Sequence, residues 1–133
     1  MARDTLLGFP AHTLPYRRRR FSFFCRAVLE MLPFIDFFPD VIHCNDWQTG
    51  PICILLKEVY GKFTAYKNIK TLYTIHNLQY QGTFPRETME MLEIPDYCYN
   101  NMEFYGQISF MKSGLMYADA VSTVSKTYAE EIK

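Results

Sequence analysis

The sequence lacks the short motifs that mark several common catalytic sites. It contains no G-x-G-x-x-G loop and no Walker loop, which excludes a self-sufficient site for a nucleotide phosphate. It contains no G-x-S-x-G elbow, and no cysteine is set up with a base as a nucleophile. His43, His76 and Asp46 do not have the spacing of metal ligands. We therefore expect neither a metal ion nor a cofactor.

Long apolar runs, paired cysteines and net charge are also missing. No apolar run approaches the roughly 20 residues that cross a bilayer, and the N-terminus lacks the apolar core of a secretory signal. The four cysteines show no C-x-x-C spacing, which indicates buried free thiols in a reducing compartment. The formal net charge is zero, so no global field attracts nucleic acid or an acidic membrane. We expect a cytoplasmic protein that binds neither.

Apolar and aromatic residues, by contrast, are abundant. They make up 49% and 17% of the sequence, which excludes disorder, and 133 residues are enough for one core. A run of four arginines at 17–20 is the main local concentration of charge. We interpret it as a solvated face, because no basic stripe accompanies it elsewhere. Gly8, Pro10 and Pro15 argue against a long element in the first 20 residues.

Hydrophobic periodicity predicts that helices and strands alternate. The expected helices are 21–32, 50–60, 86–92, 103–117 and 126–133, and the expected strands are 41–44, 70–75 and 120–124. This order predicts an α/β fold, in which a parallel sheet is flanked by helices on both faces.

Two helices carry more specific expectations. The first should bury Phe24, Ala27, Val28 and Met31, which recur at helical spacing. The helix at 50–60 should begin with Thr49 as its N-cap and should hold Pro51 in its first turn.

Polar side chains follow two of the predicted strands directly. The strand at 41–44 is expected to be short and buried, and it is followed by Asn45, Asp46, Trp47 and Gln48. The strand at 70–75 is followed by His76, Asn77, Gln79, Tyr80 and Gln81. Open parallel sheets bind ligands beyond the carboxyl ends of their strands, so both groups should share one pocket. Hydrogen-bonding groups beside flat aromatic faces suit a sugar.

Several of these residues also have a purely structural interpretation. His43 is expected to be a hydrogen-bonded histidine of the core rather than a ligand. Trp47 is equally compatible with covering the end of the sheet, and Asp46 with capping the next helix or orienting the loop. His76 is the residue for which a functional role is favoured, because its position is the most exposed.

Five segments together resemble the N-terminal domain of bacterial glycogen synthase and plant starch synthase. They are 20–30, 39–50, 74–82 (Thr-Ile-His-Asn-Leu-Gln-Tyr-Gln-Gly), 103–114 and 117–132. By this resemblance, residues 21–133 are part of a Rossmann-like, acceptor-side domain, one half of a two-domain GT-B fold, and residues 1–20 are an unmatched segment. The family transfers glucose with retention from ADP-glucose or UDP-glucose to the non-reducing end of an α-1,4-glucan, without a metal.

The resemblance also implies residue roles. His76 lines the donor-sugar pocket and Asp46 lies in the same cleft, so both are expected to be catalytic. The expected substrate-binding residues are Asn77, Tyr80, Gln81, Trp47, Asn45 and Gln48.

Two parts of the family pattern are absent from these 133 residues: the Lys-Thr-Gly-Gly-Leu loop and the C-terminal domain that holds most of the nucleotide. The last helix also stops in mid-element, which suggests an excerpt. We therefore expect the chain alone to be inactive and prone to self-association through exposed edges. The alternative is a non-catalytic glucan-binding or self-associating module.

Overall fold

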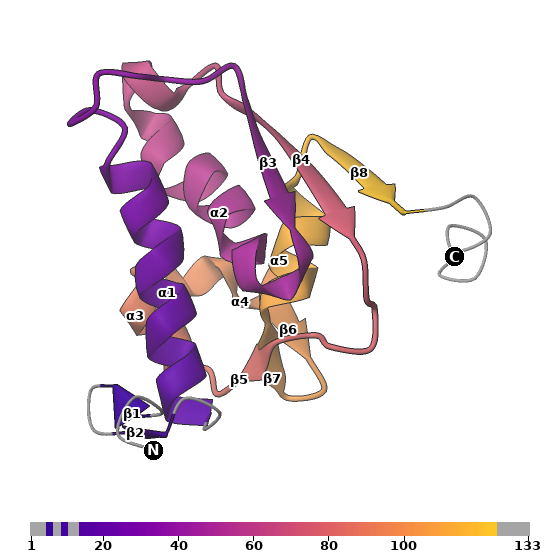
Figure 1. The fold of residues 1–133 in the computed structure, drawn as a ribbon. Coiled ribbons are helices and arrows are strands. Elements are labelled where there is room, and N and C mark those ends of the chain that lie inside the picture. Colours follow the sequence, from indigo (N-terminus) through magenta and orange to yellow (C-terminus); the bar gives the residue numbers. More distant parts are fainter. Residues whose placement is uncertain (1–4, 7–8, 11–13, 125–133) are drawn as a thin grey trace.

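The computed structural model describes residues 5–6, 9–10 and 14–124 (Figure 1). The helices and strands are β1 (Thr5–Leu6), β2 (Phe9–Pro10), α1 (Leu14–Glu30), β3 (Val41–Asn45), α2 (Asp46–Glu58), β4 (Lys70–Ile75), β5 (Thr83–Phe84), α3 (Thr88–Leu92), α4 (Tyr99–Met102), β6 (Glu103–Phe104), β7 (Gln107–Ser109), α5 (Phe110–Tyr117) and β8 (Ala120–Thr123), with 3-10 turns at Tyr60–Lys62, Thr64–Tyr66 and Asp96–Cys98. The helix expected at 126–133 lies outside the described residues.

The central sheet has three parallel strands in the order β3–β4–β8. Asn45 of β3 pairs with Thr74 of β4, and Thr74 pairs in turn with Ser122 of β8. The carboxyl ends of the strands therefore meet at one edge, where β3 runs directly into α2 and β4 runs into the loop after Ile75 (Figure 1). The predicted α/β class and the parallel arrangement are confirmed.

The core lies between the sheet and the helices α1, α2 and α5 (Figure 1). Helix α2 is buried on nearly all sides along Ile52 to Leu56, as expected for a helix that is apolar all round. Its contact with α5 is very close, because a Cβ at Gly50 would lie 1.9 Å from the carbonyl oxygen of Phe110. Only a glycine fits at that crossing.

The strand at 41–44 was expected to be buried, but only Cys44 is. Val41, on the opposite face, is 54% exposed. In the described part of the chain β3 is an edge strand, and no helix packs on the face of the sheet that carries Val41. The prediction was wrong because it assumed cover on both faces.

Helix α1 begins at Leu14, seven residues earlier than expected, and includes the arginines at 17–20. Pro15 does not prevent this, because proline is tolerated in the first turn of a helix. The predicted buried face is also wrong: Phe24 and Met31 are each 46% exposed, whereas Cys25 and Leu29 are fully buried. The Cys25 thiol donates a hydrogen bond to the Gln48 carbonyl of α2 at 3.2 Å, so a small side chain is needed where the helices meet.

Helix α2 begins at Asp46, and Thr49 is not its N-cap. The Thr49 hydroxyl instead donates to the carbonyl oxygens of Asn45 (2.8 Å) and Asp46 (3.2 Å) within the first turn. Pro51 consequently lies inside the helix. The N-cap rule failed here because the strand turns into the helix within one residue, at Asp46, whose φ is 61°.

The helix expected at 103–117 is a helix only from Phe110. The preceding residues form the hairpin β6–β7, which turns at Tyr105 (φ 52°) and Gly106 (φ 83°). Two left-handed residues in succession make the tight hairpin turn that suits the twist of antiparallel strands. Strand β7 also pairs with β5, which ties the hairpin to the segment after β4.

Candidate functional site

Asp46 holds the end of β4. Its Oδ1 accepts the backbone N–H of His76 at 2.6 Å and that of Asn77 at 3.3 Å, and its Oδ2 lies 3.1 Å from Nδ1 of the His76 ring. No side-chain bond caps the start of α2. Of the two structural alternatives for Asp46, capping a helix or orienting the loop, the geometry therefore favours the loop.

This contact also orients His76. Because Nδ1 faces a carboxylate, the hydrogen of the neutral ring resides on Nδ1, and Nε2 keeps its lone pair. The side chain is 47% exposed, so a ligand can reach the ring. A ring that is held on one side and open on the other is arranged to accept a hydrogen bond.

The loop after His76 is shaped by its own amides. The Asn77 side-chain oxygen accepts the N–H of Gln79 at 2.9 Å, and the Gln81 side-chain nitrogen donates to the Leu78 carbonyl. The Gln81 carbonyl accepts from the Ser109 hydroxyl and from the Met111 N–H, each at 3.1 Å. The loop is therefore fixed against the N-terminus of α5, and the predicted ligands Asn77 and Gln81 also have structural roles.

Trp47 is largely a core residue. It is 8% exposed, and its ring meets those of Phe21 and Phe84 with centroids 5.1 and 5.9 Å away. A Cβ at Gly82, whose φ is 63°, would lie 2.3 Å from the indole. The ring therefore supports the loop from beneath, in agreement with the structural interpretation of Trp47.

The remaining predicted residues differ in position. Tyr80 is 58% exposed on the loop. Asn45 is exposed at the end of β3, beside Asp46. Gln48 is half-buried in the first turn of α2, where its carbonyl accepts the Cys25 thiol. Asn45 and Gln48 thus follow the chain out of β3, and Tyr80 lies on the loop that follows β4.

A cavity of about 340 Å³ opens beside the loop. It brings together the predicted residues Trp47, Tyr80 and Gln81, with Arg17 of α1 and Phe104 of β6. Its lining does not include the other predicted site residues, which are His76, Asp46, Asn77, Asn45 and Gln48. Sequence reasoning missed Arg17 and Phe104 because each was assigned to the wrong kind of element.

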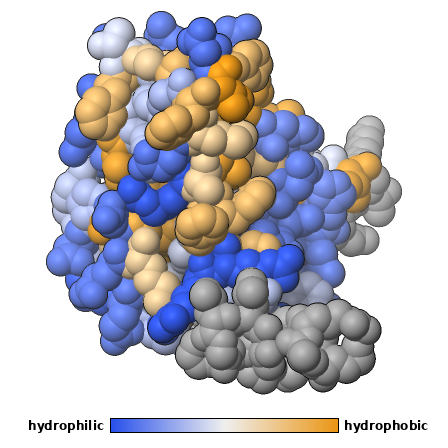
Figure 2. All heavy atoms as spheres, turned by 60° about the vertical axis from the view of Figure 1, so that its left-hand side comes forward, coloured by the Kyte–Doolittle hydropathy of each residue, from blue (hydrophilic) through white to orange (hydrophobic). Residues whose placement is uncertain are grey.

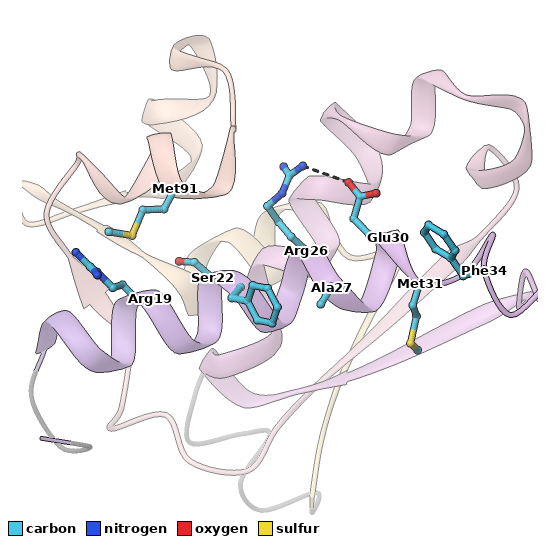
Figure 3. A pocket seen from close by; sticks show the side chains of 9 residues that line it. Arg19, Ser22, Arg26, Ala27, Glu30, Met31, Phe34 and Met91 are labelled. Carbon is cyan, nitrogen blue, oxygen red and sulfur yellow. Dashed lines mark hydrogen bonds and ion pairs between the residues drawn. The ribbon is translucent and has the colours of Figure 1, made fainter. Parts of the chain in front are cut away.

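A larger hollow, of about 760 Å³, lies on the outer face of α1 and contains none of the predicted residues (Figure 3). Its lining is mainly apolar, with Phe23 75% and Phe34 89% exposed, and an ion pair between Arg26 and Glu30 borders it. Figure 2 shows hydrophobic side chains gathered on this side of the molecule. Size alone therefore does not identify the site that the motifs indicate.

His43 lies in a polar row across the open face of the sheet. Its Nε2 is 2.7 Å from the Thr74 hydroxyl, which is 2.7 Å from the Ser122 hydroxyl. The expectation of a hydrogen-bonded histidine is confirmed, but the expectation of a core position is wrong, because His43 is exposed.

The cysteines are buried free thiols, as predicted, and burial raises the pKa of Cys25. Among the residues that the structure describes, no three His, Cys, Asp or Glu side chains come together as metal ligands would. Within the same residues, none of the helices has the length and apolar character needed to span a bilayer.

Several known proteins are similar to this chain in sequence, and one is similar in fold. A family model described as the starch synthase catalytic domain matches residues 3–133, a range that includes most of the segment without recognised motifs. The glycogen synthase of Moorella thermoacetica is 55% identical over 116 residues, which are 86% of this chain and 24% of that protein. That of Clostridioides difficile is 53% identical over 117 residues, with the same shares covered.

A solved structure agrees with them. The catalytic domain of starch synthase IV from Arabidopsis thaliana, bound to ADP and acarbose, matches with a TM-score of 0.79 and 31% identity over 87% of this chain and 24% of that chain. The chain thus spans about a quarter of the length of the relatives that it matches. The resemblance seen in the motifs is confirmed, and the chain belongs to the glycosyltransferase family of glycogen and starch synthases.

Proposed function

We propose that this chain is part of a synthase that transfers glucose, with retention, from ADP-glucose or UDP-glucose to the non-reducing end of an α-1,4-glucan. The observation that carries this proposal is the Asp46–His76 pair at the carboxyl edge of the parallel sheet, where such sheets bind ligands. The ADP and acarbose bound to the Arabidopsis structure support a nucleotide-linked donor and a carbohydrate acceptor. The free buried thiols support a cytoplasmic location.

His76 is the proposed catalytic residue. Glucosyl transfer develops positive charge at the anomeric carbon, so a group that holds a sugar hydroxyl should not add positive charge beside it. A neutral imidazole with Nδ1–H on Asp46 meets this requirement, since its Nε2 accepts a hydroxyl hydrogen. Asp46 acts through His76, and we therefore assign it as a positioning residue rather than a catalytic one.

The surrounding residues are proposed to bind substrate. Asn77, Tyr80 and Gln81 lie on the loop that His76 begins. Asn45 ends β3, and Trp47 and Gln48 lie in the first turn of α2. The 133-residue chain alone should be inactive, because a leaving diphosphate needs several cations. Arg17 is the one cation among the described residues that line the cavity beside the loop.

The test uses a hybrid synthase in which this chain replaces the matching segment of the Moorella thermoacetica enzyme. His76→Ala should lower kcat on the order of a hundredfold, the usual effect of losing one preorganised contact, with little change in Tm. His43→Ala is the matched control, since His43 is an exposed histidine of the same sheet that bonds the Thr74 hydroxyl and is not one of the proposed binding residues, and it should stay within a few-fold of the parent. A folded His76→Ala hybrid with parental kcat would overturn the proposal.

One observation favours a second candidate function. The exposed apolar hollow along α1 supports a self-associating, non-catalytic module. That function predicts stable oligomers of the chain and no kinetic effect of His76→Ala in the hybrid.

A further inference from the structure

The hairpin β6–β7 presents a tyrosine that packing does not explain. Tyr105 is 90% exposed, yet it occupies the left-handed region with a φ of 52°, which bulky residues rarely adopt. Its ring lies edge-on to Phe104, with centroids 4.6 Å apart. Strained, exposed residues that the surrounding structure holds in place are concentrated at ligand sites.

The hairpin is rigidly held. The Glu103 carboxylate accepts the N–H of Gly106 at 2.8 Å and so closes the turn. The Lys112 ammonium donates to the Glu103 carbonyl at 2.7 Å, which ties the hairpin to α5. Strand β7 pairs with β5 through Ser109 and Thr83, so the hairpin keeps a fixed position relative to the loop that follows β4.

The cavity of about 340 Å³ lies between this loop and the hairpin. It has the mixed lining that a sugar needs: aromatic surface from Tyr80 and Phe104, and amides from Gln79 and Gln81. Its volume falls within the usual range of small-molecule sites. The α1 hollow, in contrast, has a mainly apolar lining, and Arg17 alone is too little positive charge for a diphosphate.

We propose that this cavity and the hairpin tip bind glucose residues of the acceptor glucan behind its reacting end. Phe104 and Tyr105 supply faces for the C–H surfaces of the sugar rings, and Gln79, Gln81 and Arg17 bond their hydroxyls. The inference rests on the proposed function, because it extends the acceptor path from His76 along the loop 76–82. It adds Arg17, Phe104 and Tyr105 to the residues that meet substrate.

The decisive variants are Tyr105→Ala and Tyr105→Gly in the hybrid synthase. Both should raise KM for glycogen and weaken retardation in glycogen-containing gels by about three- to tenfold, the range for one aromatic contact. KM for maltose and for ADP-glucose should not change, since neither reaches the hairpin. Tyr105→Gly should also raise Tm because it relieves the left-handed strain, which separates the loss of binding from damage to the fold.

Three further variants complete the experiment: two that should retain glycogen binding and one that should weaken it. Tyr97→Ala removes another exposed tyrosine, one whose hydroxyl bonds Glu58 away from the cavity, and it should leave glycogen affinity unchanged. Phe104→Ala should weaken glycogen binding as Tyr105→Ala does, and Tyr105→Phe should retain it because the ring face remains.

The outcomes separate this inference from the proposed function. Parental glycogen affinity in both Tyr105 variants, together with loss of turnover in His76→Ala, would overturn the subsite and leave the proposed function intact. Parental turnover in His76→Ala would overturn the catalytic assignment. A glycogen affinity lowered by Tyr105→Ala would still support the subsite in that case.

Discussion

Asp46 and His76 are 30 positions apart, and one carboxylate fixes both the backbone and the ring of the histidine. Oδ1 receives the His76 N–H at 2.6 Å, while Oδ2 lies 3.1 Å from Nδ1. The carboxylate can do this because Asp46 takes a φ of 61°, which turns it from β3 towards β4. Asp tolerates this left-handed conformation better than most residues. The strain at Asp46 is therefore linked to the position of His76.

The first prediction concerns Asp46→Asn in the hybrid synthase. An amide oxygen can still accept the His76 N–H, but the amide nitrogen then faces Nδ1 and favours the opposite tautomer of the ring. We expect kcat to fall by about tenfold or more, because Nε2 would carry a hydrogen where it should accept one. KM for ADP-glucose should change less.

The ¹⁵N NMR spectrum of the His76 ring tests whether Asp46 acts by fixing the tautomer of His76. Asp46→Asn should shift the His76 signals from the Nδ1–H towards the Nε2–H tautomer, while the His43 signals serve as an internal control. An unchanged His76 spectrum with an unchanged kcat would show that Asp46 only supports the loop.

The strands and the position of the site could be predicted because their signals are local. β-Branched and aromatic residues at 71–75 mark a strand, and polar residues follow at once. Parallel adjacency then brings Asp46 and His76 to the same edge. Which atoms bond could not be predicted, since that depends on the backbone turn at Asp46.

The predictions from the sequence were wrong where contacts between distant segments determine which residues are buried and where a helix begins. Periodicity assigned Phe24 to the core, but α1 meets α2 at Cys25, because the backbone at Gln48 comes too close for a larger side chain. The hairpin was taken for helix because its left-handed turn at Tyr105 and Gly106 leaves no trace in the hydrophobic pattern. The cavity was missed because its lining includes Phe104 of this hairpin and Arg17, which lies in α1 ahead of the start expected at residue 21.

The second prediction concerns Asp119, which joins the beginnings of β8 and β4. Its carboxylate accepts the Lys57 ammonium at 2.7 Å and the Thr71 N–H at 2.8 Å. Burial raises the pKa of Asp119, but the hydrogen bonds from Lys57 and Thr71 outweigh burial and lower the pKa below the usual 3.8. The unfolded chain therefore binds a proton more readily, and the stabilisation is present above pH 4 and is lost as pH falls through the folded pKa.

Asp119→Asn should reduce the free energy of unfolding at pH 7 by about 1 kcal/mol, since the ion pair is partly exposed. The deficit should shrink as the pH falls below 4, in urea titrations of parent and variant at several pH values. Asp40→Asn, an exposed aspartate at the corresponding position before β3, should be within about 0.5 kcal/mol of the parent. A deficit for Asp119→Asn that is the same at pH 7 and pH 3 would contradict the linkage.

The last prediction compares two glycines with left-handed backbones. Gly82 has a φ of 63° and would place a Cβ 2.3 Å from the Trp47 ring, whereas Gly106 has a φ of 83° and no atom within 4 Å of its Cβ position. Alanine at either site should cost about 1–2 kcal/mol for the backbone conformation. Gly82→Ala should cost about 1–3 kcal/mol more, because the Trp47 ring is packed between Phe21 and Phe84 and cannot move aside.

The difference between the two variants is thus the contribution of the close contact alone, measured as free energies of unfolding in urea. Gly82→Ala should also lower kcat in the hybrid, because the chain can relieve the clash only by moving the loop 76–82, and that movement would carry His76 away from Asp46. Equal stability losses for the two glycines would mean that the loop accommodates a methyl group against Trp47. In that case the contact with the indole would not determine the position of the loop. The position of His76 would then depend on the Asp46 carboxylate and on the hydrogen bonds from Ser109 and Met111 to the Gln81 carbonyl.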